Sequence, residues 1–286
     1  MPAPSAVVVL NPQAADGCAA TLRRPVTAWL ARHAPGVSLL MPDGVHAAKA
    51  MLTILAPRTR VVLIGGDGTL HAMLPAALKG GLRLGLVPAG RRNRIARALG
   101  LDTAHWAEAL NFALHAPTAP VDVGLLETED LLVHVIGAVR LDSQTAMTLA
   151  IDNQRCRPPR TGTRLALQLC NAGPDTPVPT PAGGEPPIEI NDGRFDVLAG
   201  PPPAGRWQHL LRRALPGPVT DAAAPIEHQQ GRSILVECDS LMAIRADGEP
   251  LTPSTRLHLE MLPRALELTG SHVAMLDPHR FVDTTW

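Results

Sequence analysis

Two different patterns of apolar and polar residues divide this chain. Over roughly the first 125 residues, short apolar runs typical of buried strands alternate with stretches of helical spacing. We expect strands at Ala6–Leu10, Val37–Met41, Arg60–Ile64 and Leu82–Val87, and helices within Cys18–Ala34, Val45–Ala56, Leu70–Leu78, Ile95–Leu99 and Thr103–His115. This order predicts an α/β, doubly wound, mostly parallel Rossmann-like sheet, in which ligands bind at the carboxyl ends of the strands.

The pattern changes near Val121, where short strands follow one another. We expect strands at Leu131–Val139, Arg164–Cys170, Ile188–Ile190, Phe195–Leu198, Ser233–Cys238, Leu241–Arg245 and Arg256–Met261, one helix at Arg206–Leu215, and a loop over Asn171–Pro187. The sequence therefore predicts two domains: residues 1–124 form an α/β nucleotide-binding domain, and residues 125–286 form an all-β, sandwich-like domain. A return of the chain's end to the first domain stays open.

Composition narrows the class of protein. Lys plus Arg and Asp plus Glu each number 26, so no global basic field indicates a nucleic-acid partner. The four cysteines are scattered without a CxxC pair, which favours reduced thiols over zinc ligation. No apolar run approaches the ~18–20 residues that span a bilayer, and the start of the chain lacks the charged region of a signal peptide. We expect a cytoplasmic protein; its oligomeric state, a homodimer included, stays open.

The stretch of the chain that most clearly indicates chemistry is Val61–Leu70, an apolar strand followed by Gly65-Gly66-Asp67-Gly68 and a helical pattern. Such a strand–turn–helix lets backbone N–H groups approach phosphate oxygens, with help from the helix dipole. Because an acid in the turn would repel a bare phosphate, Asp67 suggests a magnesium ion or a hydroxyl to be activated. An ordinary glycine-rich turn is the alternative.

Three further segments carry candidate chemistry. Leu86–Arg94 is a second strand-end turn that leads into a helix, Asn191–Asp196 contains Asp192-Gly193, and Ala246–Glu249 lies between two expected strands. Asp-Gly pairs are also common in hairpin turns, so the last two segments have a purely structural interpretation as well.

Taken together and in this order, these motifs resemble the diacylglycerol kinase catalytic-domain family, which includes bacterial lipid kinases and sphingosine kinases and is related to NAD kinases. The resemblance covers about residues 6–265. It rests on Gly65–Leu70, Leu86–Gly90 with Asn93 and Ile95–Leu101, Val121–Gly124, Asp192–Asp196 and Asp247–Glu249, with Asn11-Pro12 after the first strand.

The resemblance implies transfer of the γ-phosphoryl group of ATP to a lipid hydroxyl, with Mg²⁺ as cofactor and the site between the two domains. It implies that the nucleotide is held by Asn11, Gly65, Gly66, Gly68, Thr69, Gly90, Arg92 and Asn93. Asp67, Asp247 and Glu249 would supply carboxylates for magnesium and for the attacking hydroxyl. Asn191, Asp196 and the carbonyl of Arg194 would form a second, structural magnesium site.

The chain departs from the family at its second nucleotide motif. The usual Gly-Thr-Gly-Asn-Asp is here Gly90-Arg91-Arg92-Asn93-Arg94, which puts a side chain where backbone should approach phosphate and reverses one charge. Loss of that acid could cost on the order of 10²–10⁴ in rate. Alternatively, the arginines bind phosphate and take over part of the metal's role, or Arg91 and Arg94 point to solvent. In addition, the family usually has an acid after the position of His71, and this chain has Ala72 there. The family also has an Asn- and Gly-rich strand after Gly124, of which Leu131–Val139 keeps only Gly137.

Other enzyme classes lack their motifs. The chain has no GxxxxGK[ST], no GxGxxG after its first strand, no GxSxG and no HExxH. Two classes of function remain: an ATP-dependent lipid kinase, or a catalytically impaired relative that binds nucleotide or phospholipid in a regulatory role. An NAD kinase-like small-alcohol kinase is a variant of the first. The basic, apolar segment Arg206–Leu215 could give transient contact with an anionic membrane surface, or simply pack by its leucines.

Overall fold

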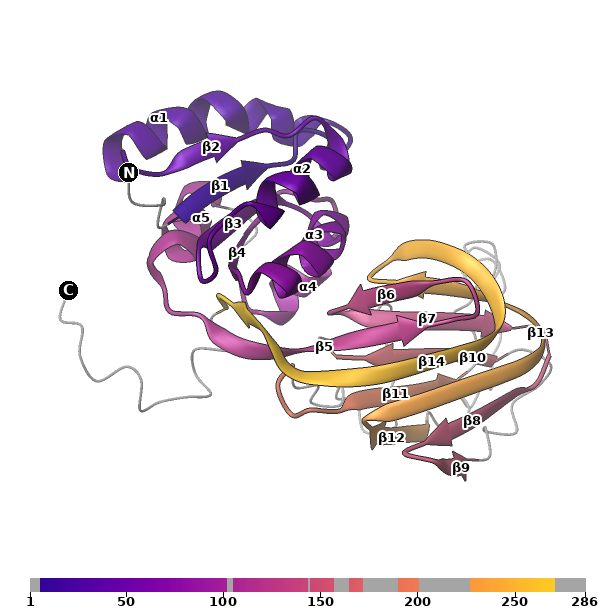
Figure 1. Cartoon of the computed structure of the whole chain (residues 1–286). Helices are drawn as coiled ribbons and strands as arrows, with labels where there is room; N and C mark the ends of the chain where they lie inside the picture. Colours follow the sequence, from indigo (N-terminus) through magenta and orange to yellow (C-terminus); the bar gives the residue numbers. More distant parts are fainter. Residues whose placement is uncertain are drawn as a thin grey trace, which may run out of the picture.

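The computed structural model describes residues 6–101, 105–143, 145–156, 165–171, 190–200 and 227–270. Its first part contains a parallel sheet in the order β2 (Ser38–Leu40), β1 (Ala6–Leu10), β3 (Arg60–Gly65) and β4 (Arg83–Pro88). The connections between these strands are helical, as parallel neighbours require. Figure 1 shows this part as the helix-rich half of the molecule.

Helices cover both faces of the parallel sheet. Along β1, Val7 and Val9 pack with α2 (Gly44–Thr53), α3 (Asp67–Gly80) and α4 (Arg94–Ala98), whereas Val8 and Leu10 pack with α1 (Arg23–His33) and α5 (Trp106–His115). A short 3₁₀ helix, η1 (Cys18–Leu22), precedes α1. Since successive strand side chains point to opposite faces, the two cores confirm the doubly wound α/β class.

The second part is built from antiparallel strands. They are β5 (Ala119–Glu127), β6 (Leu132–Val135), β7 (Ala138–Ser143), β8 (Met147–Ile151), β9 (Gln154–Cys156), β10 (Leu165–Cys170), β11 (Phe195–Gly200), β12 (Glu227–Gly231), β13 (Ser233–Ala246) and β14 (Glu249–Leu268). A Cβ added to Gly124 of β5 would lie 2.8 Å from the ring of Phe195 in β11. The strands therefore face one another across a shared apolar core, as in a sandwich.

One strand belongs to both parts. β14 pairs with β13 and β5 for most of its length, and its last residues, Glu267 and Leu268, pair in parallel with Arg83 and Leu84 of β4. The backbone N–H of Thr269 then donates to the carbonyl of Leu84 at 2.9 Å. A continuous sheet consequently runs through the molecule, and the turn between β13 and β14 comes to lie beside the first part (Figure 1).

Several expected boundaries differ from the structure. Ser233–Cys238 and Leu241–Arg245 form one strand, β13, because a register shift between Glu237 and Met242 absorbs the break in apolar alternation. Leu131–Val139 is two strands, β6 and β7. Strands β5, β8, β9 and β12 were not expected, and β14 is far longer than Arg256–Met261. α3 contains Pro75 within its span.

Some expectations fall outside the described residues. These are the helix at Arg206–Leu215, the first two residues of the expected helix Thr103–His115, most of the loop Asn171–Pro187, and all of Ile188–Ile190 except its last residue. Among the helices that the structure describes, none has both the length and the apolar character needed to cross a bilayer.

Candidate functional site

The first glycine turn opens helix α3. Gly66 is the N-cap residue, and its carbonyl accepts the N–H groups of Thr69 at 3.0 Å and Leu70 at 3.1 Å. The N–H groups of Asp67 and Gly68 have no backbone acceptor among the described residues. Because unpaired N–H groups and the helix dipole together favour negative charge, this turn is suited to an anion such as phosphate.

The two glycine turns touch. A Cβ added to Gly66 would lie 2.9 Å from the Cα of Gly90, and one added to Gly90 would lie 2.6 Å from the Cα of Gly66. Asn93, in the left-handed conformation with φ 46°, accepts the Gly90 N–H and donates to the Gly90 carbonyl, both at 2.8 Å. Asn93 therefore shapes the second turn, and both turns form one backbone surface without side chains between them.

Asn11, which follows β1, forms a hydrogen bond that links the end of this strand to the first glycine turn. Its Nδ2 donates to Thr69 Oγ1 at 2.8 Å, while its Oδ1 accepts the Gln13 N–H at 3.0 Å. A Cβ on Gly65 would overlap the Thr69 side chain. The residues expected to hold nucleotide at this turn are thus assembled in one place, with Arg92 exposed at its rim.

Asp67 is largely buried and caps helix α4. Its Oδ2 accepts the Arg94 N–H at 3.0 Å and its Oδ1 accepts the Ile95 N–H at 3.1 Å. The Arg94 Nε lies 3.7 Å from the same Oδ2. Both carboxylate oxygens are therefore engaged by α4, and one also faces a guanidinium.

Asp247 has a side chain with 0% exposure and four donors around it. Its Oδ1 accepts the N–H groups of Gly137 at 2.7 Å and Ala138 at 3.2 Å, and its Oδ2 accepts that of Ile136 at 3.2 Å and pairs with His71 Nδ1 at 3.0 Å. Since a carboxylate offers about four lone-pair directions, this residue is saturated. It joins the β13–β14 turn to β7 and orients His71.

His71 has a side chain that is 14% exposed and lies next to a second histidine. Burial, and then the charge of His71, hold the pKa of His134 below its ordinary value. The sequence suggested no role for His134, and it suggested for His71 only agreement with the family pattern. The His71–Asp247 pair spans 176 residues, so no local signal could have found it.

Glu249 is exposed, unlike the other two expected catalytic carboxylates. A Cβ on Gly68 would lie 2.7 Å from Glu249 Oε1. The glycine in the turn thus makes room for this carboxylate, and Glu249 faces the N-terminus of α3 from the opposite part of the molecule.

Arg94 is directed into the site. Its Nη2 donates to the Asp247 carbonyl at 3.4 Å and lies where a Cβ on Gly248 would be. Burial lowers the pKa of Arg94 from its ordinary value, against the raising effect of Asp67. Arg91, by contrast, is exposed and pairs with Asp16. The expectation that both arginines point to solvent is wrong for Arg94.

Two of the expected magnesium ligands, Asp67 and Asp247, do not suit a divalent ion. Asp247 has no lone pair left, and no described group of three or more His, Cys, Asp or Glu residues could hold a metal. With Mg²⁺–oxygen distances of about 2 Å, an ion on Asp67 Oδ2 would lie within about 6 Å of the Arg94 Nε. At an effective dielectric constant of about 20, that repulsion is about 5 kcal/mol. Asp67 and Asp247 therefore do not form a divalent-metal site in this structure.

At the second expected metal site, formed by Asn191, Arg194 and Asp196, one buried carboxylate oxygen lacks a hydrogen-bond partner among the described residues. Asp196 is fully buried; its Oδ1 accepts from His228 Nε2 at 2.6 Å and Gln230 Nε2 at 3.0 Å, and its Oδ2 has no partner among the described residues. Asn191 and Arg194 lie in and after the preceding turn, and the Arg194 N–H donates to Asp192. Because one orphaned oxygen is not a ligand set, this site stays a prediction.

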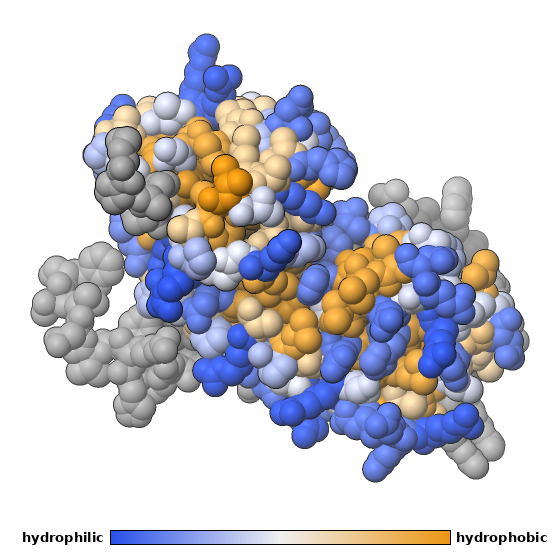
Figure 2. Space-filling model, in the orientation of Figure 1, coloured by the Kyte–Doolittle hydropathy of each residue, from blue (hydrophilic) through white to orange (hydrophobic). Residues whose placement is uncertain are grey.

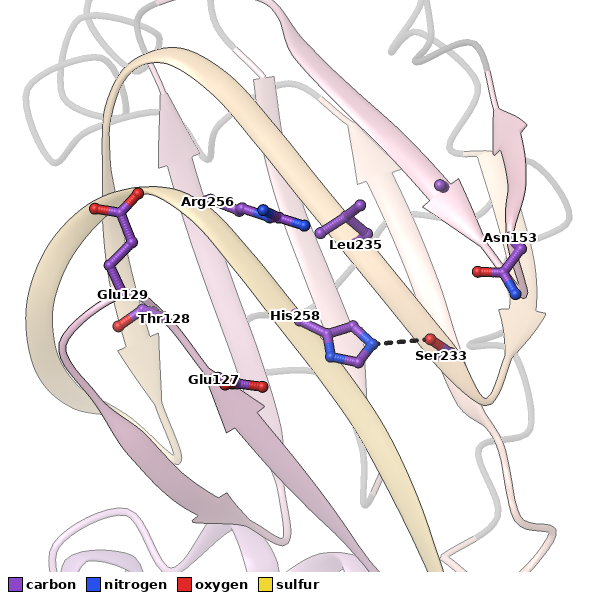
Figure 3. Close-up of a pocket in the computed structure, with 9 residues that line it drawn as sticks. Glu127, Thr128, Glu129, Asn153, Ser233, Leu235, Arg256 and His258 are labelled. Carbon is purple, nitrogen blue, oxygen red and sulfur yellow. Dashed lines mark hydrogen bonds between the residues drawn. The ribbon is translucent and has the colours of Figure 1, made fainter.

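A pocket of about 480 Å³ lies elsewhere, on the β-rich part (Figure 3). Glu127, Glu129, Arg256 and His258 are among its lining residues, and His258 Nε2 lies 2.9 Å from Ser233 Oγ. The lining is mostly polar, so this pocket suits a polar group better than an acyl chain. No motif in the sequence pointed to it, since its residues come from four separate strands and their turns.

The fold and the two glycine turns define a class: an α/β protein with a backbone surface suited to an anion, joined to a β-rich part that contributes Asp247 and Glu249. Comparison with known proteins makes this more specific. Residues 5–126 match the model of the diacylglycerol kinase catalytic domain. A diacylglycerol kinase of Bacillus subtilis (strain 168) is 30% identical over 105 residues, which are 36% of this chain and 34% of that protein. The chain thus aligns with about a third of this relative's length.

Solved structures extend the likeness of fold to the whole chain. The crystal structure of a diacylglycerol kinase from Bacillus anthracis str. Sterne gives a TM-score of 0.67 at 16% identity, covering 95% of this chain and 98% of that one. A second solved chain from the same strain gives 0.69 at 16% identity, with 96% and 99% covered. Residues 5–126 are thus similar in sequence to the diacylglycerol kinase catalytic domain, and the solved structures share the fold of nearly the whole chain.

Proposed function

We propose that the chain binds ATP at the two glycine turns and transfers its γ-phosphoryl group to the hydroxyl of a lipid of the diacylglycerol type. The observation that carries the proposal is the contact between the turns at Gly66 and Gly90, which clears a backbone surface at the N-terminus of α3. Phosphoryl transfer depends mainly on positioning and charge neutralisation, which such a surface can supply.

Each residue has a distinct proposed role. The N–H groups of Asp67 and Gly68 hold phosphate oxygens, and Asn11 keeps Thr69 and the turn in place. Glu249 accepts the proton of the attacking hydroxyl, because it is the exposed carboxylate beside Gly68. Arg94 supplies positive charge. Asp247 acts through its contacts, as a positioning residue for His71 and for the turn that carries Glu249.

The acceptor would enter at the junction of the two parts. On the face shown in Figure 2, apolar residues gather over the strands of the β-rich part near the α/β part. Leu132 of β6, a strand in contact with α3, is 61% exposed. An apolar rim next to the phosphate site suits a lipid that offers its hydroxyl from a bilayer surface. Contact with the membrane would then be peripheral and transient, and we propose action at the cytoplasmic face.

A titration with ATP, followed by a phosphoryl-transfer screen over lipid acceptors, tests the proposal. Binding with turnover on a lipid alcohol is expected, and soluble alcohols serve as the comparison that separates an NAD kinase-like activity. Failure to bind ATP or ADP at millimolar concentration would remove the proposal altogether.

A second candidate is a non-catalytic member that binds nucleotide or phospholipid in a regulatory role. The engagement of Asp67 by α4 and Arg94 favours it, since this carboxylate is the acid of the glycine turn. ATP binding without turnover on any lipid, unaffected by Glu249→Gln, would select this candidate. Dimerisation has no bearing on the choice between the two and stays a prediction.

A further inference from the structure

Arg94 lies at the place where the site needs positive charge. Its backbone N–H and its guanidinium both face Asp67, and its Nη2 reaches the carbonyl of Asp247 in the β13–β14 turn. Only 21% of the side chain is exposed. A single cation therefore bridges the phosphate-binding turn and the turn that carries Glu249.

This bridge needs a glycine. The guanidinium occupies the space of a side chain at Gly248, which has φ +89°. A residue other than glycine at this position would collide with Arg94 and strain the backbone. The β13–β14 turn is thus shaped to receive the guanidinium.

Two of the three carboxylates at the site, those of Asp67 and Asp247, are compensated by neighbouring groups. Asp67 is neutralised by Arg94 at 3.7 Å, and Asp247 is surrounded by three backbone N–H groups and His71. A phosphate at the N-terminus of α3 meets helix N–H groups and a partly buried guanidinium, which binds phosphate oxygens with charge-assisted hydrogen bonds.

We propose that this site binds the nucleotide phosphates without a divalent cation held by the protein, and that the Arg94 guanidinium takes the place of that cation. This inference rests on the proposed nucleotide site. It also makes Arg94 the residue that sets the metal requirement, because an acid at this position would restore a pair of carboxylates with Asp67.

The test measures ATP binding by calorimetry to the full chain, in excess EDTA and in millimolar Mg²⁺. For the wild type, we expect dissociation constants within about threefold of each other. For Arg94→Asp, we expect binding to weaken by about tenfold or more in EDTA and to recover about fivefold or more with Mg²⁺. Arg94→Lys keeps the charge and should keep binding independent of Mg²⁺.

A second readout does not depend on nucleotide. Added Mg²⁺ should raise the melting temperature of Arg94→Asp and leave that of the wild type unchanged, because the variant replaces the guanidinium that repels an ion from Asp67 with a second carboxylate. If Arg94→Asp does not fold, Arg94→Gln, which removes the charge alone, should weaken binding in EDTA by about tenfold without recovery. Arg32→Gln, at an exposed arginine near the end of α1, is the control for loss of a positive charge and should bind within about twofold of wild type.

The outcomes separate this inference from the function on which it rests. Wild-type binding that falls tenfold or more in EDTA, or charge-removing variants that bind in EDTA like the wild type, would overturn the role of Arg94 while the nucleotide site stands. No ATP binding in either condition would overturn both.

Discussion

Replacing Asp247 by Asn tests whether this carboxylate is a structural support. The side chain is fully buried and accepts from Ile136, Gly137, Ala138 and His71. Asn is nearly the same size and tolerates the left-handed backbone, here with φ 51°, as well as Asp does. The substitution therefore removes charge and one acceptor atom and leaves the backbone geometry unstrained.

The expected loss of stability follows from the hydrogen-bond donors around Asp247. The Asn oxygen can keep Gly137 and Ala138, but its NH₂ group then faces the Ile136 N–H, which was 3.2 Å from Oδ2. A buried donor without acceptor costs about 1–3 kcal/mol. Two charge-assisted hydrogen bonds become neutral, which loses roughly half of each. His71 can reduce the loss at its own hydrogen bond by changing tautomer. We expect a total of about 3 kcal/mol, which lowers the melting temperature by about 6–12 °C.

Thermal and urea unfolding followed by circular dichroism measure this loss. Glu249→Gln is the matched control, because it makes the same chemical change two residues away on an exposed side chain and should shift stability by no more than about 0.5 kcal/mol. If Asp247→Asn unfolds like this control, the four hydrogen bonds contribute nothing, and a structural role for Asp247 is refuted.

Four further outcomes are expected. Glu249→Gln should lower phosphoryl transfer to lipid by about 10² or more at unchanged melting temperature, and full turnover would contradict its role as proton acceptor. Gly90→Ala should cost about 1–3 kcal/mol in urea unfolding and weaken ATP binding in calorimetry, since its Cβ would press against the facing glycine turn. Backbone N–H groups, first that of Ser233, hold the pKa of Asp152 below its ordinary value. Its stabilisation is therefore present at neutral pH and lost as pH falls through that pKa, so Asp152→Asn should narrow the difference in unfolding free energy between neutral and acid pH. Burial opposes ionisation of the Cys238 thiol, yet hydroxyl groups around its sulfur bring its pKa below the ordinary value, so its alkylation should show a midpoint pH below that of a model thiol.

Local patterns in the sequence were sufficient for the first part of the fold. The strand Arg60–Ile64, its glycines and the following helix are set by residues within one strand–turn–helix unit, and the structure has them within a residue or two. Apolar alternation likewise found most strands of the second part. It failed at β13 because a register shift interrupts the period, and at β9 and β12 because short, polar edge strands have no apolar period.

The site was harder to predict because its contacts are long-range. The sequence placed Asn11, Thr69, Gly66 and Gly90 on turns at the same end of the sheet, and parallel topology brings such ends together. The sequence could not show which carboxylates accept hydrogen bonds from backbone N–H groups, because these contacts depend on packing between strands far apart in the chain. The sequence could not show that the Arg94 side chain points into the site for the same reason.

The pairing of β14 with β4 has a consequence for how the molecule folds. Strand β4 ends at Pro88, but its neighbour arrives only with Glu267 and Leu268, nearly two hundred residues later along the chain. Contacts of such sequence separation form late and slowly, and until then β4 presents an open edge to the solvent. We therefore expect that the segment matching the catalytic-domain model, residues 5–126, does not fold stably by itself. A fragment ending there would expose that edge and lack the turn bearing Asp247, so we expect it to aggregate during synthesis unless the rest of the chain follows.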